Sequence, residues 1–244
     1  MKTPAPPSFT LVELLVVVSI IGLLAGLAIP AVQGGLTAAR KAESVNQLKQ
    51  LGTLAVAYTA ENSGSLPEEG GEGLQGFTQL GNFTNAWYNV LPPMAGFLAA
   101  SNYLQRPAGF YEKGSLFFLK GAKYPANRNS RAYFAYGINS QLEDPTSPAN
   151  TILNMNRIRR PSKTALFAEA RLPDETSLPP TGGRSDALGQ PKVRDLRFVS
   201  RHRGHGIVVF CDGHAESIRA ATLADVTNPS VVIWNQQEAE LAGH

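Results

Sequence analysis

The sequence predicts an α+β fold in which one long N-terminal helix packs against an antiparallel β-sheet head that carries long loops. Three observations predict it. Residues 9–39 are apolar or uncharged apart from Glu13, and a helical pattern continues over residues 40–62. Short strand-like runs follow between turns, and no helical pattern of adequate length separates them, which favours an antiparallel sheet over a doubly wound one. We therefore divide the chain into a helix over 9–62 and a head over 63–244.

The uncharged run is long enough to cross a membrane. No residue from Leu14 to Ala39 is charged, and as a helix this run covers roughly 39 Å, against about 30 Å for a bilayer core. A cleaved secretory signal has a shorter apolar core, followed by a small-residue cleavage site. Here no A-x-A site follows the run, and the small residue Ser8 precedes it. A buried core helix would not normally be so continuously apolar. We expect the helix to stay in the protein, with residues 9–39 as its membrane part.

Glu13 is unusual because it lies inside the first turns of this apolar helix. A lone carboxylate is costly to bury in hydrocarbon, so such a residue usually has a partner or a functional role. The simpler interpretation is that Glu13 marks the interfacial end of an ordinary anchor.

The stretch "SFTLVELLVVVSIIGLLAGLAIP", residues 8–30, resembles the class III signal of type IV pilins and type II secretion pseudopilins. The resemblance implies that residues 1–8 are a prepilin leader, removed between Ser8 and Phe9, and that Phe9 is then N-methylated. It places Glu13 at the fifth mature position, and Pro30 where many members have a helix-kinking proline. The family usually has glycine where this chain has Ser8.

The family reading gives Glu13 an assembly role. In a filament of parallel helices its carboxylate would meet the Phe9 amino group of a neighbouring subunit, since a buried charge is tolerated only with a partner. The implied partners are other pilin-like subunits, a prepilin peptidase and an inner-membrane assembly platform. The implied protein is a pseudopilin-like structural subunit of a type II secretion or type IV pilus-like system, single-pass in the inner membrane with its head in the periplasm.

A second hypothesis stays open. The chain could be a membrane-tethered periplasmic binding module, for carbohydrate or calcium, that uses the pilin-like segment only as an anchor. Calcium would have candidate ligands in Glu68, Glu69 and Glu72 of the polar stretch 63–86. No regular ligand spacing such as D-x-D-x-D is present, so we favour a solvated acidic loop and expect no cofactor.

Beyond the membrane part, apolar and small residues from Leu36 to Tyr58 recur between charged ones, which is typical of an amphipathic helix over residues 40–62. Pro30 removes one backbone hydrogen bond and Gly34-Gly35 lowers helix propensity, so we expect a kink or local loosening over residues 30–36. Asn62, Gly64 and Pro67 predict the end of the helix.

The head shows five strand-like runs, one short helix and a long insertion. The insertion, residues 171–195, is polar and rich in turn residues, so we expect an exposed loop. A short helix is expected after Pro93. The strand-like runs are 116–120, 132–139, 163–170, 206–218 and 230–234.

The C-terminal stretch "HRGHGIVVFCDGH" carries His202, nine intervening residues, and then Asp212 and Gly213. It looks like the H-X9-DG signature of a group of bacterial pseudopilin-like proteins. Asp212-Gly213 predicts a two-residue type I′ hairpin turn, with His202 bonded to the loop that leads into the hairpin. The alternative is a metal site, and its candidate ligands are His202, His205, Asp212 and His214. Arg201 and Arg203 would put positive charge beside the cation, so we favour the structural explanation.

Other classes of function find little support. The chain has no G-x-S-x-G elbow, no H-E-x-x-H helix and no phosphate-binding glycine loop, so we expect it not to be an enzyme. A net charge of +3 with 17% charged residues does not indicate a dedicated nucleic-acid binder. The single cysteine, Cys211, excludes an internal disulfide and a multi-cysteine zinc site. Because Cys211 lies on an alternating strand pattern, we expect a buried, inert thiol.

Overall fold

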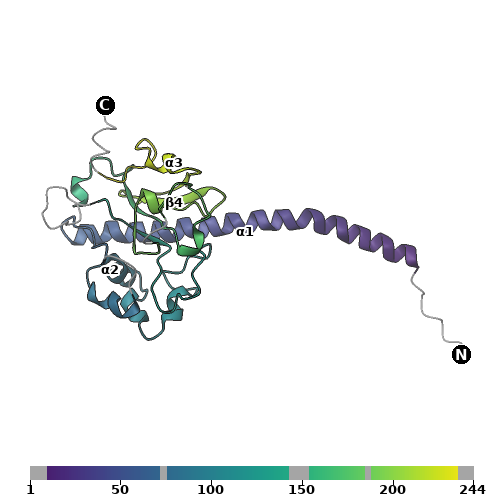
Figure 1. The fold of residues 1–244 in the computed structure, drawn as a ribbon, viewed down its shortest axis with the longest axis horizontal. Coiled ribbons are helices and arrows are strands. Elements are labelled where there is room, and N and C mark those ends of the chain that lie inside the picture. Colours follow the sequence, from purple (N-terminus) through teal and green to yellow (C-terminus); the bar gives the residue numbers. More distant parts are fainter. Residues whose placement is uncertain (1–9, 72–75, 143–153, 185–187, 236–244) are drawn as a thin grey trace. The chain divides into compact units, whose positions relative to one another are not determined.

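The computed structural model describes residues 10–71, 76–142, 154–184 and 188–235. It divides into two compact units, residues 1–40 and residues 41–244, which are described separately. Helix α1 (Leu11–Glu61) is continuous along the chain through both (Figure 1). The predicted leader and its cleavage site between Ser8 and Phe9 lie outside the described residues, and so does Glu72.

The first unit is the N-terminal part of α1. Its helical conformation includes Pro30 and runs on through Gly34 and Gly35, so the loosening expected over residues 30–36 does not interrupt the helix. Pro30 lacks one N–H donor, and the remaining hydrogen bonds of the turn hold the helical path. α1 is the one helix in the described ranges that is long and apolar enough to span a membrane.

In the second unit, the rest of α1 buries one stripe of its surface. The buried residues recur every three or four positions, which is the spacing of one helix face. They are Ser44, Leu48, Leu51, Gly52, Ala55 and Thr59. No described residue of α1 before Ser44 is buried.

The helix ends where left-handed backbone begins. Ser63 has φ 55° and Gly64 has φ 84°, and the Gly64 N–H donates to the Thr59 carbonyl at 2.7 Å. The Asn62 side chain donates to the Tyr58 carbonyl at 2.8 Å. These bonds satisfy carbonyls that the last helical turn leaves open. The stop predicted from Asn62 and Gly64 is therefore confirmed.

The head contains one five-stranded sheet in the order β3-β1-β2-β4-β5. Its strands are β1 (Tyr136–Asn139), β2 (Ala165–Glu169), β3 (Lys192–Val193), β4 (His205–Phe210) and β5 (Ala215–Arg219). The β1–β2, β2–β4 and β4–β5 pairs are antiparallel, whereas β1–β3 is parallel. The chain is α+β as predicted, but the prediction of a purely antiparallel sheet is wrong at the β3 edge. There the end of the 171–195 insertion returns beside β1, and the Ile138 N–H donates to the Pro191 carbonyl.

Two predicted strands are absent. Residues 116–120 form turns, because their carbonyls are bonded by a side chain: the Gln47 amide of α1 donates to the carbonyls of Leu116 and Phe118. Residues 230–234 make a single bridge, Thr164 to Ile233, and no strand. The predicted short helix lies earlier than expected, as α2 (Trp87–Met94), which ends near Pro93 instead of beginning there.

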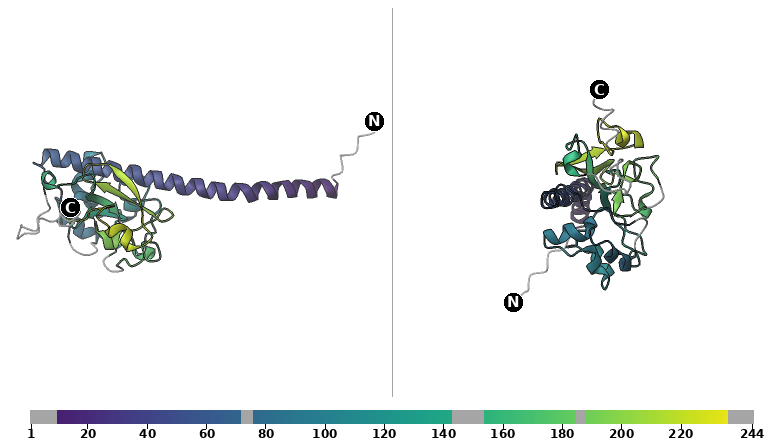
Figure 2. Two further views of the ribbon diagram at one scale, coloured as in Figure 1. Left: turned by 90° about the horizontal axis from the view of Figure 1, so that it is seen from above. Right: turned by 90° about the vertical axis from the view of Figure 1, so that its left-hand side faces the viewer.

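Both faces of the sheet are covered, and β4 shows the alternation. Ile207 and Val209 join the larger core cluster, which includes Leu48 and Leu51 of α1. Val208 and Phe210 join a second cluster that contains Val226 of α3 (Leu223–Thr227). Successive side chains of a strand point to opposite faces, so β4 is buried on both. In the ribbon views of Figure 2, the part of α1 within the head runs along one side of the green strands and the yellow α3 lies on the other. Short 3₁₀ helices complete the head: Phe77–Asn82, Ala100–Tyr103, Pro107–Tyr111, Met155–Arg157, Pro173–Glu175 and Asp195–Arg197.

Candidate functional site

Glu13 and Thr10 form a reciprocal capping box at the start of α1. The Thr10 N–H and hydroxyl both donate to Glu13 Oε2, at 2.9 and 2.8 Å, and the Glu13 N–H donates to Thr10 Oγ1 at 3.2 Å. Such bonds satisfy backbone donors that a helix N-terminus leaves open. The T-x-x-E spacing of Thr10 and Glu13 ahead of an apolar run is the sequence signal of this box, and our sequence reasoning missed it. The second oxygen, Oε1, makes no hydrogen bond with a described residue.

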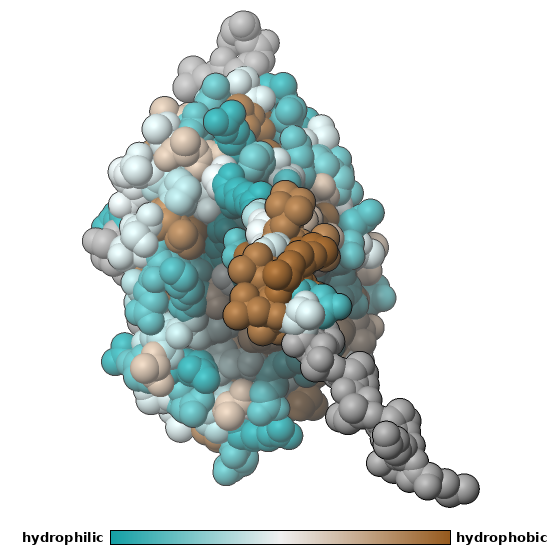
Figure 3. Space-filling view, turned by 90° about the vertical axis from the view of Figure 1, so that its right-hand side faces the viewer, coloured by the Kyte–Doolittle hydropathy of each residue, from teal (hydrophilic) through white to brown (hydrophobic). Residues whose placement is uncertain are grey.

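The large side chains of the apolar part of α1 are exposed in the single chain. Its large hydrophobic side chains from Leu11 to Leu36 are between 46% and 79% exposed, and they form a brown, hydrophobic surface in Figure 3. Contiguous exposed apolar surface of this length on a single chain indicates contact with lipid or with other chains.

At the other end of the sequence, His202 of the motif is buried beside a carboxylate. Its Nε2 lies 3.2 Å from Glu169 Oε1, and the second oxygen of Glu169 accepts the Ile207 N–H at 3.0 Å. His202 thus connects the chain just before β4 to the end of β2. The expected bond from His202 to its own loop is a backbone pair, because His202 and His205 each donate an N–H to the other's carbonyl.

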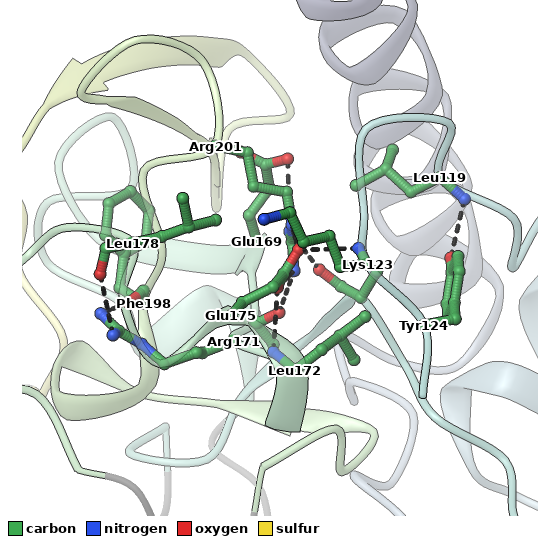
Figure 4. Close-up of polar contacts among 12 residues, drawn as sticks. Leu119, Lys123, Tyr124, Glu169, Arg171, Leu172, Glu175, Leu178, Phe198 and Arg201 are labelled. Atoms are coloured by element: carbon green, nitrogen blue, oxygen red, sulfur yellow. Dashed lines mark hydrogen bonds and ion pairs between the residues drawn. The ribbon is translucent and has the colours of Figure 1, made fainter. Parts of the chain in front are cut away.

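Arg201, next to His202, is the centre of a buried charge network (Figure 4). Its guanidinium binds Glu175 through two bonds, Nε to Oε1 at 2.8 Å and Nη2 to Oε2 at 2.6 Å. It also lies 3.4 Å from Glu169 Oε1, and all three side chains are at most 1% exposed. Further donors to Glu175 are the backbone N–H groups of Lys123 and Leu172. Every charge of the network therefore has a partner.

The network holds these groups in their charged forms. Burial raises the pKa of the Glu175 carboxyl, but the Arg201 charge and the donated hydrogen bonds outweigh burial and lower its pKa overall. Burial lowers the pKa of Arg201, but attraction to Glu175 and Glu169 raises this pKa by more than burial lowers it. The net shift of the Arg201 pKa is therefore upward. The donors and acceptors of the network bind one another and nearby backbone groups, so we interpret the network as structural.

The two turns that flank β4 differ from the prediction. Arg203 and Gly204 have φ of 52° and 79°, and they join the mutually bonded His202 and His205. Positive φ at both central residues is the type I′ pattern. At the other end of β4 only Gly213 has positive φ, 86°, and the Phe210 N–H donates to the His214 carbonyl. The hairpin at Asp212-Gly213 is confirmed, but it is a three-residue loop with a glycine bulge and not a type I′ turn.

This geometry accounts for the spacing of the motif. Between His202 and Asp212 lie the two turn residues 203–204, the six residues of β4 and Cys211. The nine intervening residues are therefore one strand with its entry turn. Cys211 is buried, as expected, and burial raises the pKa of its thiol.

The metal candidates are not brought together. His202 and His205 lie at one end of β4, whereas Asp212 and His214 lie beyond the other, about 17 Å along the strand. His214 Nδ1 lies 2.5 Å from Asp212 Oδ1, and its ring stacks on Phe210. Within the described ranges no three His, Cys, Asp or Glu side chains are grouped to hold a metal ion. Of the candidate calcium ligands, Glu69 forms an ion pair with Lys192 at 2.7 Å.

Comparison of the chain with protein-family models, with curated proteins and with solved structures found no match.

Proposed function

We propose that the chain is a pseudopilin-like structural subunit, anchored in the membrane by the first part of α1 and assembled with other pilin-like subunits through it. The single observation that carries the proposal is the exposed apolar run of α1 behind Glu13. Between helices in lipid, close packing replaces the hydrophobic effect, and small residues favour it. Gly22 and Gly26 supply such positions in the middle of the run.

In this proposal the two carboxylate oxygens of Glu13 have different roles. Oε2 caps its own helix, whereas Oε1 is left to accept a hydrogen bond from the Phe9 ammonium group of a neighbouring subunit. The ammonium exists only if the Ser8–Phe9 peptide bond is hydrolysed. N-methylation keeps that amine basic, so the charge pair survives the modification.

N-terminal peptide mass spectrometry on the protein from its native membrane tests the proposal. The expected species begins at N-methylated Phe9. A chain that still begins at Met1 would leave Glu13 without a partner amine and would reject assembly by this route. The tethered binding module would then be the better hypothesis.

A further inference from the structure

We propose that a hollow in the head binds a small zwitterion, of the class of a free α-amino acid with a short apolar side chain. The hollow has a volume of about 160 Å³. At about 30 Å³ for each water molecule it has room for roughly five waters, which suits a ligand of few heavy atoms. All of its lining residues belong to the second unit, residues 41–244. The proposal therefore depends neither on membrane anchoring nor on filament assembly.

Three parts of the head line the hollow. Glu43, Gln47 and Gln50 of α1 form one wall, residues 113–116 and 118 form a second, and Phe97 contributes a third. The three α1 residues are four and three positions apart, a spacing that places side chains on the same face of a helix. The helix therefore presents one acid and two amides to the same hollow.

The hollow also has one charge of each sign. The side chains of Glu43 and Lys113 both line it, and both residues are exposed. Among the described residues, neither the Glu43 carboxylate nor the Lys113 ammonium group has an ion-pair or hydrogen-bond partner, and the Gln50 amide has none either. The fold therefore uses neither charge, and both are available to a ligand.

Side-chain contacts fix the second wall of the hollow. The Gln47 amide donates to the carbonyls of Leu116 and Phe118. The hydroxyl of the buried Tyr136 donates to the Leu116 carbonyl as well. The Phe118 ring stacks on Tyr124, with their centroids 6.2 Å apart. Because these bonds hold the wall without a ligand, binding does not have to order it first, and the entropy lost on binding is smaller.

The two charges select a zwitterion among small ligands. A ligand ammonium group would donate to the Glu43 carboxylate and a ligand carboxylate would accept from Lys113, and hydrogen bonds between ionised groups are the strong ones. A neutral sugar would neutralise neither charge, whereas a diamine or a dicarboxylate would be repelled by one of them. The Gln50 amide can donate to the ligand or accept from it. Phe97 and Phe118 provide apolar contact for a short side chain.

Saturation-transfer difference NMR on the full chain in nanodiscs tests the proposal, with L-valine as the probe. Three comparison ligands are valinamide, which lacks the carboxylate, N-acetylvaline, which lacks the ammonium group, and glucose, which is neutral. A dissociation constant in the millimolar range is expected for L-valine, because the ligand is small and the hollow is open. Each of the two valine analogues should bind about tenfold more weakly, the loss of one hydrogen bond to a charged group.

Two variants assign the charges. Glu43→Gln and Lys113→Gln are each expected to weaken the binding of L-valine about tenfold. Glu43→Gln should not change the binding of N-acetylvaline, which has no ammonium group, and Lys113→Gln should not change that of valinamide. The matched controls are Glu61→Gln on α1 and Lys120→Gln, because both residues are exposed and neither lines the hollow. Both controls should bind L-valine as the parent does, and all four variants should unfold at the parent's urea midpoint.

Several results would overturn the proposal. One is a parent chain that does not bind L-valine, and another is equal binding of L-valine and its two analogues. Glucose binding that falls in Glu43→Gln and in Lys113→Gln would show that the hollow takes a neutral sugar instead. An equal loss of L-valine binding in the control variants Glu61→Gln and Lys120→Gln would show that the effect is not specific to the hollow.

Discussion

Gly52 of α1 lies against Val209 of β4 so closely that a Cβ on Gly52 would come within 2.3 Å of Val209 Cγ1. The same glycine is 3.6 Å from the Gly213 carbonyl by that measure, and a Cβ on Gly213 would lie 3.5 Å from Val56. The helix therefore crosses the strand and the motif turn at a point where only a glycine fits.

We predict that Gly52→Ala destabilises the head by about 1–3 kcal/mol, because the added methyl group forces the helix or Val209 to move. Denaturant unfolding of the full chain in detergent measures it. Val209→Ala in the same chain should restore part of the loss, so that the double variant costs less than the sum of the single ones. The control is Thr53→Ala on the exposed neighbouring position, expected within about 0.5 kcal/mol of the parent. An additive double variant would show that the two residues do not compete for space.

Arg203→Asn is predicted to stabilise the head by about 1 kcal/mol, because Arg203 holds a positive φ of 52° that asparagine tolerates better. The measurement is the shift in the urea midpoint. Asp212→Gly is the comparison: the structure gives Asp212 no positive φ, so no gain is expected there. A larger gain at Asp212 than at Arg203 would place the type I′ turn where the sequence alone suggested it.

The type I′ turn lies at the opposite end of β4 from the position that the sequence predicted. Asp-Gly is a strong type I′ signal, and Arg-Gly is not, so the local pattern pointed to the wrong end of β4. The mutual bonds of His202 and His205, fixed by the tertiary position of β4 beside β2, decide the geometry. In contrast, the helix end at Asn62 and Gly64 was predictable because local backbone chemistry determines it.

Long-range contacts explain the other failures. Residues 116–120 have strand-like composition, but Gln47, which is far away in the sequence, bonds their carbonyls and leaves no ladder to form. The buried network could not be foreseen either, since Glu169, Glu175 and Arg201 are separated by loops without a shared motif. The capping box of Thr10 and Glu13, in contrast, was predictable, because its T-x-x-E spacing is a local signal in the sequence.

Arg201→Met is predicted to cost about 3–5 kcal/mol, because it leaves two buried carboxylates, Glu169 and Glu175, without their cation. Arg106→Met is the matched control: its pair with Glu112 is equally short at 2.6 Å but exposed, so a loss of at most about 1 kcal/mol is expected. Equal losses in thermal or urea unfolding would show that burial of the network contributes nothing.

The pH dependence of stability should report Glu175. Because its pKa is lower in the folded than in the unfolded chain, its stabilisation is complete above the ordinary glutamate pKa of about 4.3 and is lost as the pH falls through the lower folded value. Urea unfolding between about pH 6 and pH 3 should therefore show a steeper decline for the parent than for Glu175→Gln, which has no such proton to bind. Parallel curves would contradict the assigned role of Arg201 in holding this carboxylate charged.

Glu13→Gln separates the two roles of Glu13. Glutamine can close a capping box as glutamate does, so the variant keeps the bonds to Thr10 but loses the charge that would meet a neighbouring Phe9 amine. We expect membrane retention and helix content to stay unchanged, while cross-linking between subunits through cysteines placed in α1 falls to background. Thr10→Val is the reciprocal variant, because it removes the hydroxyl bonds and keeps the charge, and we expect it to reduce cross-linking only partly. Normal cross-linking in Glu13→Gln, together with its loss in Thr10→Val, would mean that Glu13 acts as a helix cap and not as an assembly charge.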